Sequence, residues 1–478
     1  MIYDVAIAGA GVIGAMVARE LSRYQLRVCV LEKGNDVACG ASKANSGIIH
    51  GGFDPEPGTL KAELNVAGVP LLYKAAEELG VPCKNNGSLV VAFGPEQEKT
   101  LQMLYARGVK NGVEKMQLLS SSAARALEPQ LSKNITAALL VPTAGIICPY
   151  ELTVAALGNA MDNGAALFLN FNITAVQKSQ HFTVTAQNGQ TVQAKYFINC
   201  AGGGADAVAA AAGEPFFKII PRAGEYLLLD KTQGSTVAHT VFGVPDENGK
   251  GVLVSPTVDG NLLLGPTAHE VPSASCTGTT QNGLNTVQSL AQKSVPGVQL
   301  RAVITSFAGV RASVKDGDFI ITPSKTVPGL IHAAGIDSPG LTACVAIARR
   351  VVTLAQNCGL ALKPSPNFNP RRKNPHAFRA MSVEEKDAYI KKHPEYGKII
   401  CRCEGVSEGE IKAALRQNPK PQDLDGVKRR TRSGMGRCQG GFCTPYILQL
   451  QVSAPVQVGA VLMKELCGTR LLATKNIK

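Results

Sequence analysis

Tryptophan is absent from the 478-residue chain, and aromatic residues together make up only 5% of it. No run of about 18 to 20 apolar residues occurs, so no bilayer-spanning helix is expected. The opening Met1-Ile2-Tyr3-Asp4 lacks the basic region of a secretion signal. With 45% hydrophobic and 18% charged residues, the composition is globular and excludes disordered, collagen-like and coiled-coil classes. We expect a soluble, cytoplasmic protein of about three domains.

Acidic residues are scarce in the last quarter of the chain. Residues 1–360 hold 27 basic and 26 acidic side chains, whereas residues 361–478 hold 22 and 10, so the net charge of +13 belongs almost entirely to the later part. A basic region can contact nucleic acid, an anionic membrane surface or an acidic protein. No helix-turn-helix, zinc-finger or aromatic RNA-reading pattern occurs there. We therefore expect no nucleic-acid partner and favour a solvated basic face.

The cysteines show no disulfide framework, because their total of 13 is odd and nine stand singly in mostly apolar or glycine-rich settings. Such scattering is typical of free thiols in a reducing compartment. The other four form two close pairs, Cys401 with Cys403 and Cys438 with Cys443, separated by 34 residues. Four thiolates brought together bind either a structural zinc or an iron-sulfur cluster.

The N-terminal region has the pattern of a dinucleotide site. A strand over residues 3–8 ends in Gly-Ala-Gly-Val-Ile-Gly at 9–14, a helical pattern follows, and a second strand over 28–31 ends in Glu32. Glycines let the backbone approach a pyrophosphate at a helix N-terminus, and the acid can accept from ribose hydroxyls. The pattern predicts a bound dinucleotide, NAD or FAD, with a structural glycine turn as the alternative.

Two later strands also end in glycine-bearing turns, over residues 196–204 and 330–342. Pro339 suits the first turn of the apolar helix that follows, which places Asp337 and Ser338 at its N-terminus. Three such strand ends returning to one sheet favour a long, extended cofactor.

These segments, together with Ser-Lys-Ala-Asn-Ser-Gly-Ile-Ile-His-Gly-Gly at residues 42–52, resemble FAD-dependent oxidoreductases of the D-amino-acid oxidase and glycerol-3-phosphate dehydrogenase family over about residues 1–360. The resemblance implies FAD and an α/β fold, in which a Rossmann-like FAD-binding domain is interleaved with an antiparallel-sheet substrate domain. The FAD-binding domain would comprise about 1–80, 145–215 and 320–360, and the substrate domain about 81–144 and 216–319. The implied cofactor-binding residues are Gly9, Gly11, Val12, Ile13, Gly14, Glu32, Lys33, Ser42, Lys43, Asn45, Ser46, Gly47, Ala201, Gly202, Gly309, Gly335, Ile336, Asp337, Ser338, Gly340, Leu341 and Thr342.

An antiparallel pattern separates the flavin segments. Asn188-Gly189 and Asp259-Gly260, both favoured hairpin turns, lie between strand-like runs. By the resemblance, such a sheet roofs the flavin.

His50 is the most specific candidate for a catalytic residue. Removing a hydride from a secondary alcohol requires a base for the hydroxyl proton, and imidazole suits that role near neutrality. Packing beside the cofactor is the alternative. Glycerol-3-phosphate oxidases and dehydrogenases carry a histidine in the same Asn-Ser-Gly-x-x-His run, and this resemblance favours the base.

Four further residues are candidates for binding an anionic substrate. A guanidinium can hold a phosphate or carboxylate through paired hydrogen bonds. The resemblance implies that role for Arg311, with catalysis depending on it, and a phosphate contact for Lys250; Arg222 and Ser338 are weaker candidates. A salt bridge from Arg311 to Asp316 or Asp318 is the structural alternative.

The C-terminal part reads as a linker over residues 361–395, rich in proline and charge, followed by a domain and tail over 396–478. Ser407 and Glu410 form a capping-box pattern that predicts a helix after the first cysteine pair. The cysteine segments resemble the [2Fe-2S] domain of bacterioferritin-associated ferredoxin, which also ends the A subunit of anaerobic glycerol-3-phosphate dehydrogenases. The resemblance implies Cys401, Cys403, Cys438 and Cys443 as cluster ligands, with zinc or an empty thiol site as alternatives.

Together these features predict an FAD-dependent dehydrogenase that oxidises sn-glycerol 3-phosphate to dihydroxyacetone phosphate. Its electrons would leave FAD through a [2Fe-2S] cluster to a partner, an electron-accepting flavoprotein or small redox subunit. Membrane association would be peripheral, at the inner face and through that partner. The alternatives are oxidation of L-2-hydroxyglutarate or another 2-hydroxy or amino acid, an electron-transfer subunit without substrate chemistry, and a zinc-bearing nucleic-acid-binding protein.

Overall fold

The first large sheet is built mainly from parallel strands that lie far apart in the sequence. The computed structural model describes residues 1–245, 251–315, 317–374 and 376–453. Strand β1 pairs in parallel with β2 and β12, and β12 pairs in parallel with β20. The eight strands are β10 (Ile173–Lys178), β11 (Phe182–Ala186), β12 (Thr191–Asn199), β1 (Ile2–Ala8), β2 (Val28–Leu31), β9 (Ala166–Phe168), β20 (Leu330–Ala334) and β19 (Ile320–Pro323). The hairpin predicted at Asn188-Gly189 is present and joins β11 to β12. Its expected place in the antiparallel sheet over the cofactor was wrong, because it belongs to this sheet with β1 and β2.

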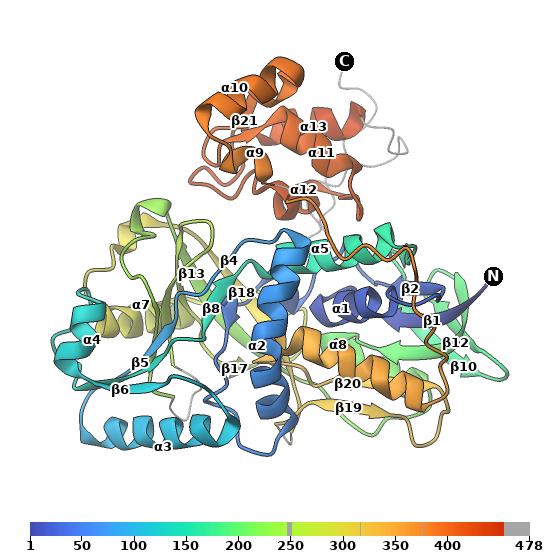
Figure 1. The fold of residues 1–478 in the computed structure, drawn as a ribbon, viewed down its shortest axis with the longest axis horizontal. Helices are drawn as coiled ribbons and strands as arrows, with labels where there is room; N and C mark the ends of the chain where they lie inside the picture. The colour runs from blue at the N-terminus through green and yellow to red at the C-terminus, as the bar shows by residue number, and fades with distance from the viewer. Residues whose placement is uncertain (246–250, 316, 375, 454–478) are drawn as a thin grey trace.

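A helical layer covers the sheet and brings its glycine turns together. The helices are α1 (Val12–Leu21), α2 (Leu60–Leu79), α5 (Pro149–Asp162) and α8 (Gly340–Asn357), and α1 contacts both α5 and α8 (Figure 1). Every residue of α1 is buried, which its glycine, alanine and valine side chains allow. Short α6 (Ala205–Ala211) follows β12, and the small sheet of β3 (Ile48–Ile49), β8 (Gly145–Ile147) and β4 (Cys83–Lys84) connects this layer to the second large sheet.

The second large sheet has nine strands and its own core of aliphatic side chains. Its strands are β17 (His269–Glu270), β13 (Ile220–Leu229), β16 (Leu262–Gly265), β15 (Leu253–Pro256), β14 (Thr240–Gly243), β5 (Ser88–Ala92), β7 (Ala137–Val141), β6 (Gln117–Ser120) and β18 (Val303–Ser313). The hairpin expected at Asp259-Gly260 joins β15 to β16. Helices α3 (Pro95–Asn111), α4 (Ser121–Leu127) and α7 (Gln281–Ser294) surround the sheet (Figure 1). The mixed α/β class and the interleaving of the two sheets along the chain confirm the expected fold.

The C-terminal region forms a small separate unit above α5 in Figure 1. It contains α9 (Ala377–Ala380), α10 (Val383–Lys392), β21 (Ile399–Cys401), β22 (Val406–Ser407), α11 (Glu408–Arg416), α12 (Leu424–Thr431) and α13 (Thr444–Ser453). The capping box predicted at Ser407 and Glu410 is present at the start of α11. A second one, formed by Ser382 and Glu385, starts α10 within the stretch expected to be a linker. The C-terminal tail beyond residue 453 lies outside the described residues.

Several arginines of the basic quarter face the rest of the chain. Arg429 and Arg430 bind Asp36, Arg432 binds Asp259, and each of these ion pairs joins the small unit to the earlier domains. Further pairs join Arg372 to Asp162 and Arg437 to Asp230. The expectation of a simple solvated basic face was wrong for Arg372, Arg429, Arg430 and Arg432, which are largely buried against acidic partners scattered through the preceding 360 residues. Arg437 remains exposed, as expected. No helix in the described ranges has the length and apolar character needed to cross a bilayer.

Candidate active site

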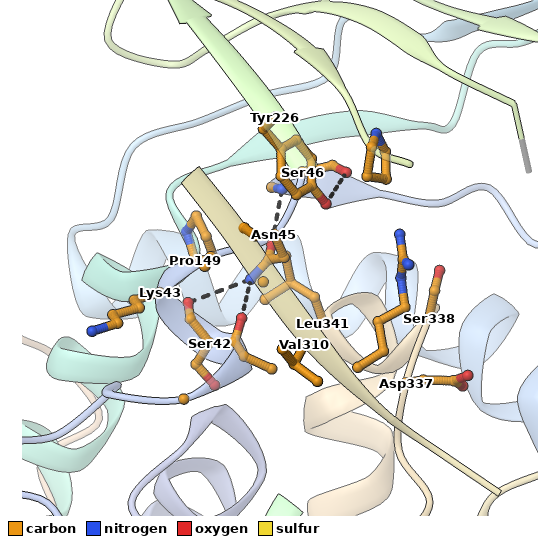
Figure 2. A pocket seen from close by; sticks show the side chains of 18 of the residues that line it. Ser42, Lys43, Asn45, Ser46, Pro149, Tyr226, Val310, Asp337, Ser338 and Leu341 are labelled. Atoms are coloured by element: carbon orange, nitrogen blue, oxygen red, sulfur yellow. Dashed lines mark hydrogen bonds between the residues drawn. The ribbon is translucent and has the colours of Figure 1, made fainter. Parts of the chain in front are cut away.

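A cavity of about 2070 Å³ lies between the two large sheets and extends to the C-terminal unit. Pockets for drug-sized molecules are usually about 300–1,000 Å³. The cavity can therefore take a long ligand and a small one together. Most of the residues predicted to bind the cofactor line it, and Figure 2 shows part of the wall, from Lys43 to Leu341.

The glycine turn after β1 leaves space that no other residue would leave. Gly9 has a left-handed backbone (φ 97°), and a Cβ there would lie 2.5 Å from the carbonyl oxygen of Cys200. A Cβ on Gly14 would overlap the carbonyl oxygen of Gly9. Gly14 therefore does not line the cavity but lets α1 pack closely on the turn. This cradle fits the pyrophosphate of a dinucleotide at the start of α1.

Glu32 is buried at the cavity wall, where the sequence predicted an acid. Its carboxylate accepts from the backbone N–H of Ala10 at 2.7 Å and from that of Gly34 at 2.8 Å. Burial raises the pKa of Glu32, and these two hydrogen bonds oppose the rise. The side chain is thereby fixed next to the turn at Gly9, in position for a ribose hydroxyl.

The loop around Ser42 forms a second wall. The Ser42 hydroxyl accepts from the backbone N–H of Val12 at 2.9 Å, which ties the loop to α1. The amide of Asn45 donates to the Ala41 carbonyl at 3.0 Å and accepts from the Gly47 N–H at 2.9 Å (Figure 2). These bonds hold the loop rigid without any contribution from a ligand.

A hydrogen bond connects this loop to the roof. The hydroxyls of Ser46 and Tyr226 lie 3.1 Å apart, and Tyr226 comes from β13 (Figure 2). A Cβ on Gly309 of β18 would collide with the Ala44 carbonyl, so glycine is required for the roof to approach the loop. Gly309 thus serves close packing while its backbone lines the cavity.

The turn before α8 forms the opposite wall. Ile336, Asp337, Ser338, Gly340 and Leu341 line the cavity there. Asp337 makes an ion pair with Lys61 at 2.5 Å and accepts from Ser313 at 2.9 Å, so its carboxylate is already engaged.

Two of the predicted cofactor residues in this region do not line the cavity. Gly335 lies behind it, and Thr342 is fully buried. The Thr342 hydroxyl accepts from the His50 backbone N–H at 2.8 Å and donates to the Ile48 carbonyl at 3.3 Å. Thr342 therefore positions the histidine segment.

His50 lines the cavity directly after β3. Its Nε2 lies 3.4 Å from the Ser338 hydroxyl, and its ring lies 6.0 Å from that of Phe242, centroid to centroid. The His50 carbonyl accepts from Asn65 at 3.0 Å, which complements the Thr342 bond on the other side. The backbone of His50 is therefore fixed, and its imidazole is presented to the cavity.

Arg222 and Arg311 are cross-strand partners on β13 and β18, and both line the cavity. Arg311 donates to the Thr267 carbonyl at 3.4 Å. The Nε of Arg222 is buried and has no hydrogen-bond partner among the described residues. The other nitrogens of these two neighbouring guanidinium groups on the cavity wall can form a site for an anion.

The structural alternative for Arg311 was a salt bridge to Asp316 or Asp318. Asp318 instead accepts from the backbone N–H groups of Leu60 and Lys61 at 2.8 and 3.0 Å, at the start of α2. Asp316 lies outside the described residues, and so does Lys250, the second predicted phosphate contact.

In space the four clustered cysteines form two pairs, each with one member from each of the two sequence pairs. The sulfurs of Cys403 and Cys438 are 3.6 Å apart, and Cys401 is hydrogen-bonded to Cys443. The bond to Cys443, with N–H groups of Gly434 and Glu404, lowers the pKa of Cys401 to about 6, although burial opposes the shift. Within the described ranges no three metal-ligating side chains gather around one point. Two pairs fit a two-iron cluster better than a single tetrahedral zinc.

Residues of the C-terminal unit also line the cavity, which the sequence did not indicate. They are Asp425, Lys428, Arg429, Arg432, Met435 and Gln439. Arg432 donates to Tyr150 at 3.1 Å, and the Tyr150 hydroxyl donates to the sulfur of Met435 at 3.3 Å. Because these partners are 282 and 285 positions apart, no local pattern could have revealed them.

Comparison with known proteins agrees with both halves of this arrangement. Residues 4–354 match the FAD dependent oxidoreductase family, and residues 399–450 match the BFD-like [2Fe-2S] binding domain. A glycerol 3-phosphate dehydrogenase of Caloramator mitchellensis is 44% identical over 448 residues, which cover 94% of this chain and 93% of that protein. Since 448 residues exceed the first 360, the similarity continues into the C-terminal domain.

Two further relatives match the earlier domains. The structure of an L-alpha-glycerophosphate oxidase from Mycoplasma pneumoniae with FAD bound has 34% identity and a TM-score of 0.75, covering 78% of this chain and 99% of that one. An L-2-hydroxyglutarate dehydrogenase of Nematostella vectensis is 30% identical, covering 74% of this chain and 90% of that protein. The chain therefore belongs to the FAD dependent oxidoreductases, with FAD as its cofactor and a [2Fe-2S]-binding domain at its C-terminal end.

Proposed function

We propose that this oxidoreductase converts sn-glycerol 3-phosphate to dihydroxyacetone phosphate. The observation that carries the proposal is the arginine pair, Arg222 and Arg311, on the wall of the cavity that also contains His50. A phosphate dianion can accept from both guanidinium groups, and an uncharged alcohol cannot satisfy them. The relatives named as glycerol 3-phosphate dehydrogenase and L-alpha-glycerophosphate oxidase support the same substrate.

His50 is the base of the proposed reaction. With the phosphate on the arginines, the C2 hydroxyl would lie toward His50, whose imidazole takes the hydroxyl proton. Ser338, 3.4 Å from Nε2, orients the ring. FAD, when bound, supplies the acceptor for the hydride on C2.

The cysteine pairs support a second stage in which electrons leave one at a time. We propose Cys401, Cys403, Cys438 and Cys443 as ligands of the [2Fe-2S] group, which supplies a one-electron carrier when bound. The loop before Cys438 reaches the cavity wall through the Met435 contact with Tyr150. The final acceptor would be a separate flavoprotein or small redox subunit.

Oxidation of L-2-hydroxyglutarate is the second candidate, favoured by the similarity to the Nematostella vectensis enzyme. A dicarboxylate would also satisfy two arginines. That similarity covers 74% of the chain, whereas the one to the Caloramator mitchellensis enzyme covers 94% and reaches the C-terminal domain. The wider match favours glycerol 3-phosphate.

An anaerobic visible spectrum of the purified protein distinguishes these candidates. Loss of the flavin band near about 450 nm with glycerol 3-phosphate and not with L-2-hydroxyglutarate is the expected result. Bleaching by L-2-hydroxyglutarate alone would transfer the assignment to that acid. Flavin that neither compound reduces would refute the proposed substrate and favour an electron-transfer subunit.

A further inference from the structure

One end of the cavity is closed by the C-terminal domain. Helix α12 contributes Asp425, Lys428 and Arg429, whose spacing places them on one face of the helix. The adjoining wall comes from the loop after β2, including Lys33 and Cys39, and the Cys39 sulfur lies 3.8 Å from Arg429. This loop follows Glu32, so the wall belongs to the end of the cavity where the adenosine half of a dinucleotide binds.

Arg429 lines the cavity at this place. Its Nη2 donates to Asp36 at 2.7 Å and lies 3.8 Å from the Cys39 sulfur. The residue is only 5% exposed, and its Nε is buried away from the cavity. A guanidinium carries five N–H groups, so these contacts leave donors for an acceptor on a ligand in the cavity.

The neighbouring arginine differs from Arg429. Arg430 donates to Asp36 through Nη1 and Nη2, each at 2.7 Å, and its Nε donates to the Pro419 carbonyl of its own domain at 2.9 Å. Arg430 thus joins the domains through Asp36 and does not line the cavity. Arg429 shares the carboxylate through Nη2 alone and does line the cavity.

We propose that α12 of the [2Fe-2S] domain is part of the FAD site, with the Arg429 guanidinium donating to an oxygen or ring nitrogen of the adenosine half. The C-terminal domain is then a wall of the nucleotide site as well as the carrier of the cluster. FAD binding stabilises the docked arrangement of the domains, and docking slows FAD release, because the two are linked through one side chain. This inference depends on FAD as the cofactor and not on the identity of the substrate.

The test compares Arg429→Lys with Arg416→Lys in the full-length protein. Lysine keeps a positive charge for Asp36 and removes the planar guanidinium, and Arg416 is an exposed arginine of the same domain outside the cavity. Dissociation constants for FAD and FMN are measured on flavin-free protein, with iron and sulfide content as a check of the cluster. We expect Arg429→Lys to weaken FAD about tenfold and leave FMN, which lacks the adenylate, within twofold. Arg416→Lys should match the unaltered protein.

Unchanged FAD affinity in Arg429→Lys would overturn the proposal, and so would equal losses for FAD and FMN. A second measurement needs no variant. Hydrogen exchange of the α12 amides in the unaltered protein should be slower with FAD than with FMN. Equal protection by both flavins would refute contact between α12 and the adenosine half.

Discussion

The carboxylate of Asp36 lies 2.7 Å from both terminal nitrogens of Arg430, a residue 394 positions later in the chain. Asp36 is fully buried in the loop after β2, and Arg429 donates to it as well. One acid of the FAD-binding domain thus holds two arginines of the C-terminal domain.

Replacing this acid should loosen the C-terminal domain. Asp36→Asn leaves two buried guanidinium groups facing a neutral amide, and breaking a buried pair in this way costs about 3–5 kcal/mol. We expect a lower midpoint of thermal unfolding and faster proteolysis between residues 361 and 395. Asp162→Asn, at a half-exposed pair with Arg372, is the control and should change both much less. Equal effects of the two variants would contradict a special role for Asp36.

The docking contact should be insensitive to pH near neutrality and fail in acid. Burial raises the pKa of Asp36, but the charges and hydrogen bonds of Arg430 and Arg429 outweigh it and lower the pKa below its usual value. A lowered pKa contributes stability that is complete above the unfolded value of about 3.9 and is lost as the pH falls through the folded value. The difference in unfolding free energy between the unaltered protein and Asp36→Asn should therefore be constant from pH 8 to 5 and shrink below about pH 3.9. A change between pH 8 and 5 would contradict this assignment.

The arginine pair predicts a defect in substrate binding. Arg311→Lys keeps the charge but removes the paired donors, so the KM for glycerol 3-phosphate should rise at least about tenfold. FAD content should stay normal, because the cofactor turn at Gly9 is untouched. The control is Arg301→Lys, an exposed arginine outside the cavity. A normal KM in Arg311→Lys would remove this residue from the phosphate site.

The sequence predicted the turns and helix caps whose geometry depends on a few adjacent residues. The turn at Gly9, the hairpin at Asp259-Gly260 and the capping box at Ser407 each depend on a few adjacent residues, and each is present. The contact between Asp36 and Arg430 could not be predicted in this way, because it joins residues of different domains. The burial of Arg429, Arg430 and Arg432 in the basic C-terminal quarter was not predicted for the same reason: their acidic partners are distant in the sequence.

Thr342 shows that a family motif also leaves the role of a site residue undetermined. The family resemblance implied a cofactor contact, and the structure buries its hydroxyl between the His50 N–H and the Ile48 carbonyl. A motif shared among relatives does not distinguish a residue that touches the ligand from one that positions its neighbour.

Removing the proposed base should slow flavin reduction. His50→Asn retains polarity without an imidazole that takes a proton near neutrality, and general-base catalysis typically contributes about 10²–10⁴-fold. Stopped-flow reduction by glycerol 3-phosphate should be slower by a factor in that range, with FAD still bound. His181→Asn, in the turn that joins β10 to β11 and outside the cavity, is the control. A rate within twofold of the unaltered protein would leave His50 a packing residue.

The cysteine pairs predict that the two stages of the reaction can be separated. Cys438→Ser removes a thiolate from the pair with Cys403, and we expect loss of bound iron and sulfide. Flavin reduction by glycerol 3-phosphate should persist, because FAD and substrate lie in the cavity and not at the thiols, while electron delivery to a one-electron acceptor should fall. Cys276→Ser, a thiol outside both the cavity and the cysteine pairs, is the control. Full delivery by an iron-free Cys438→Ser protein would mean that electrons leave the flavin directly, and that the C-terminal domain serves the protein by closing the nucleotide site.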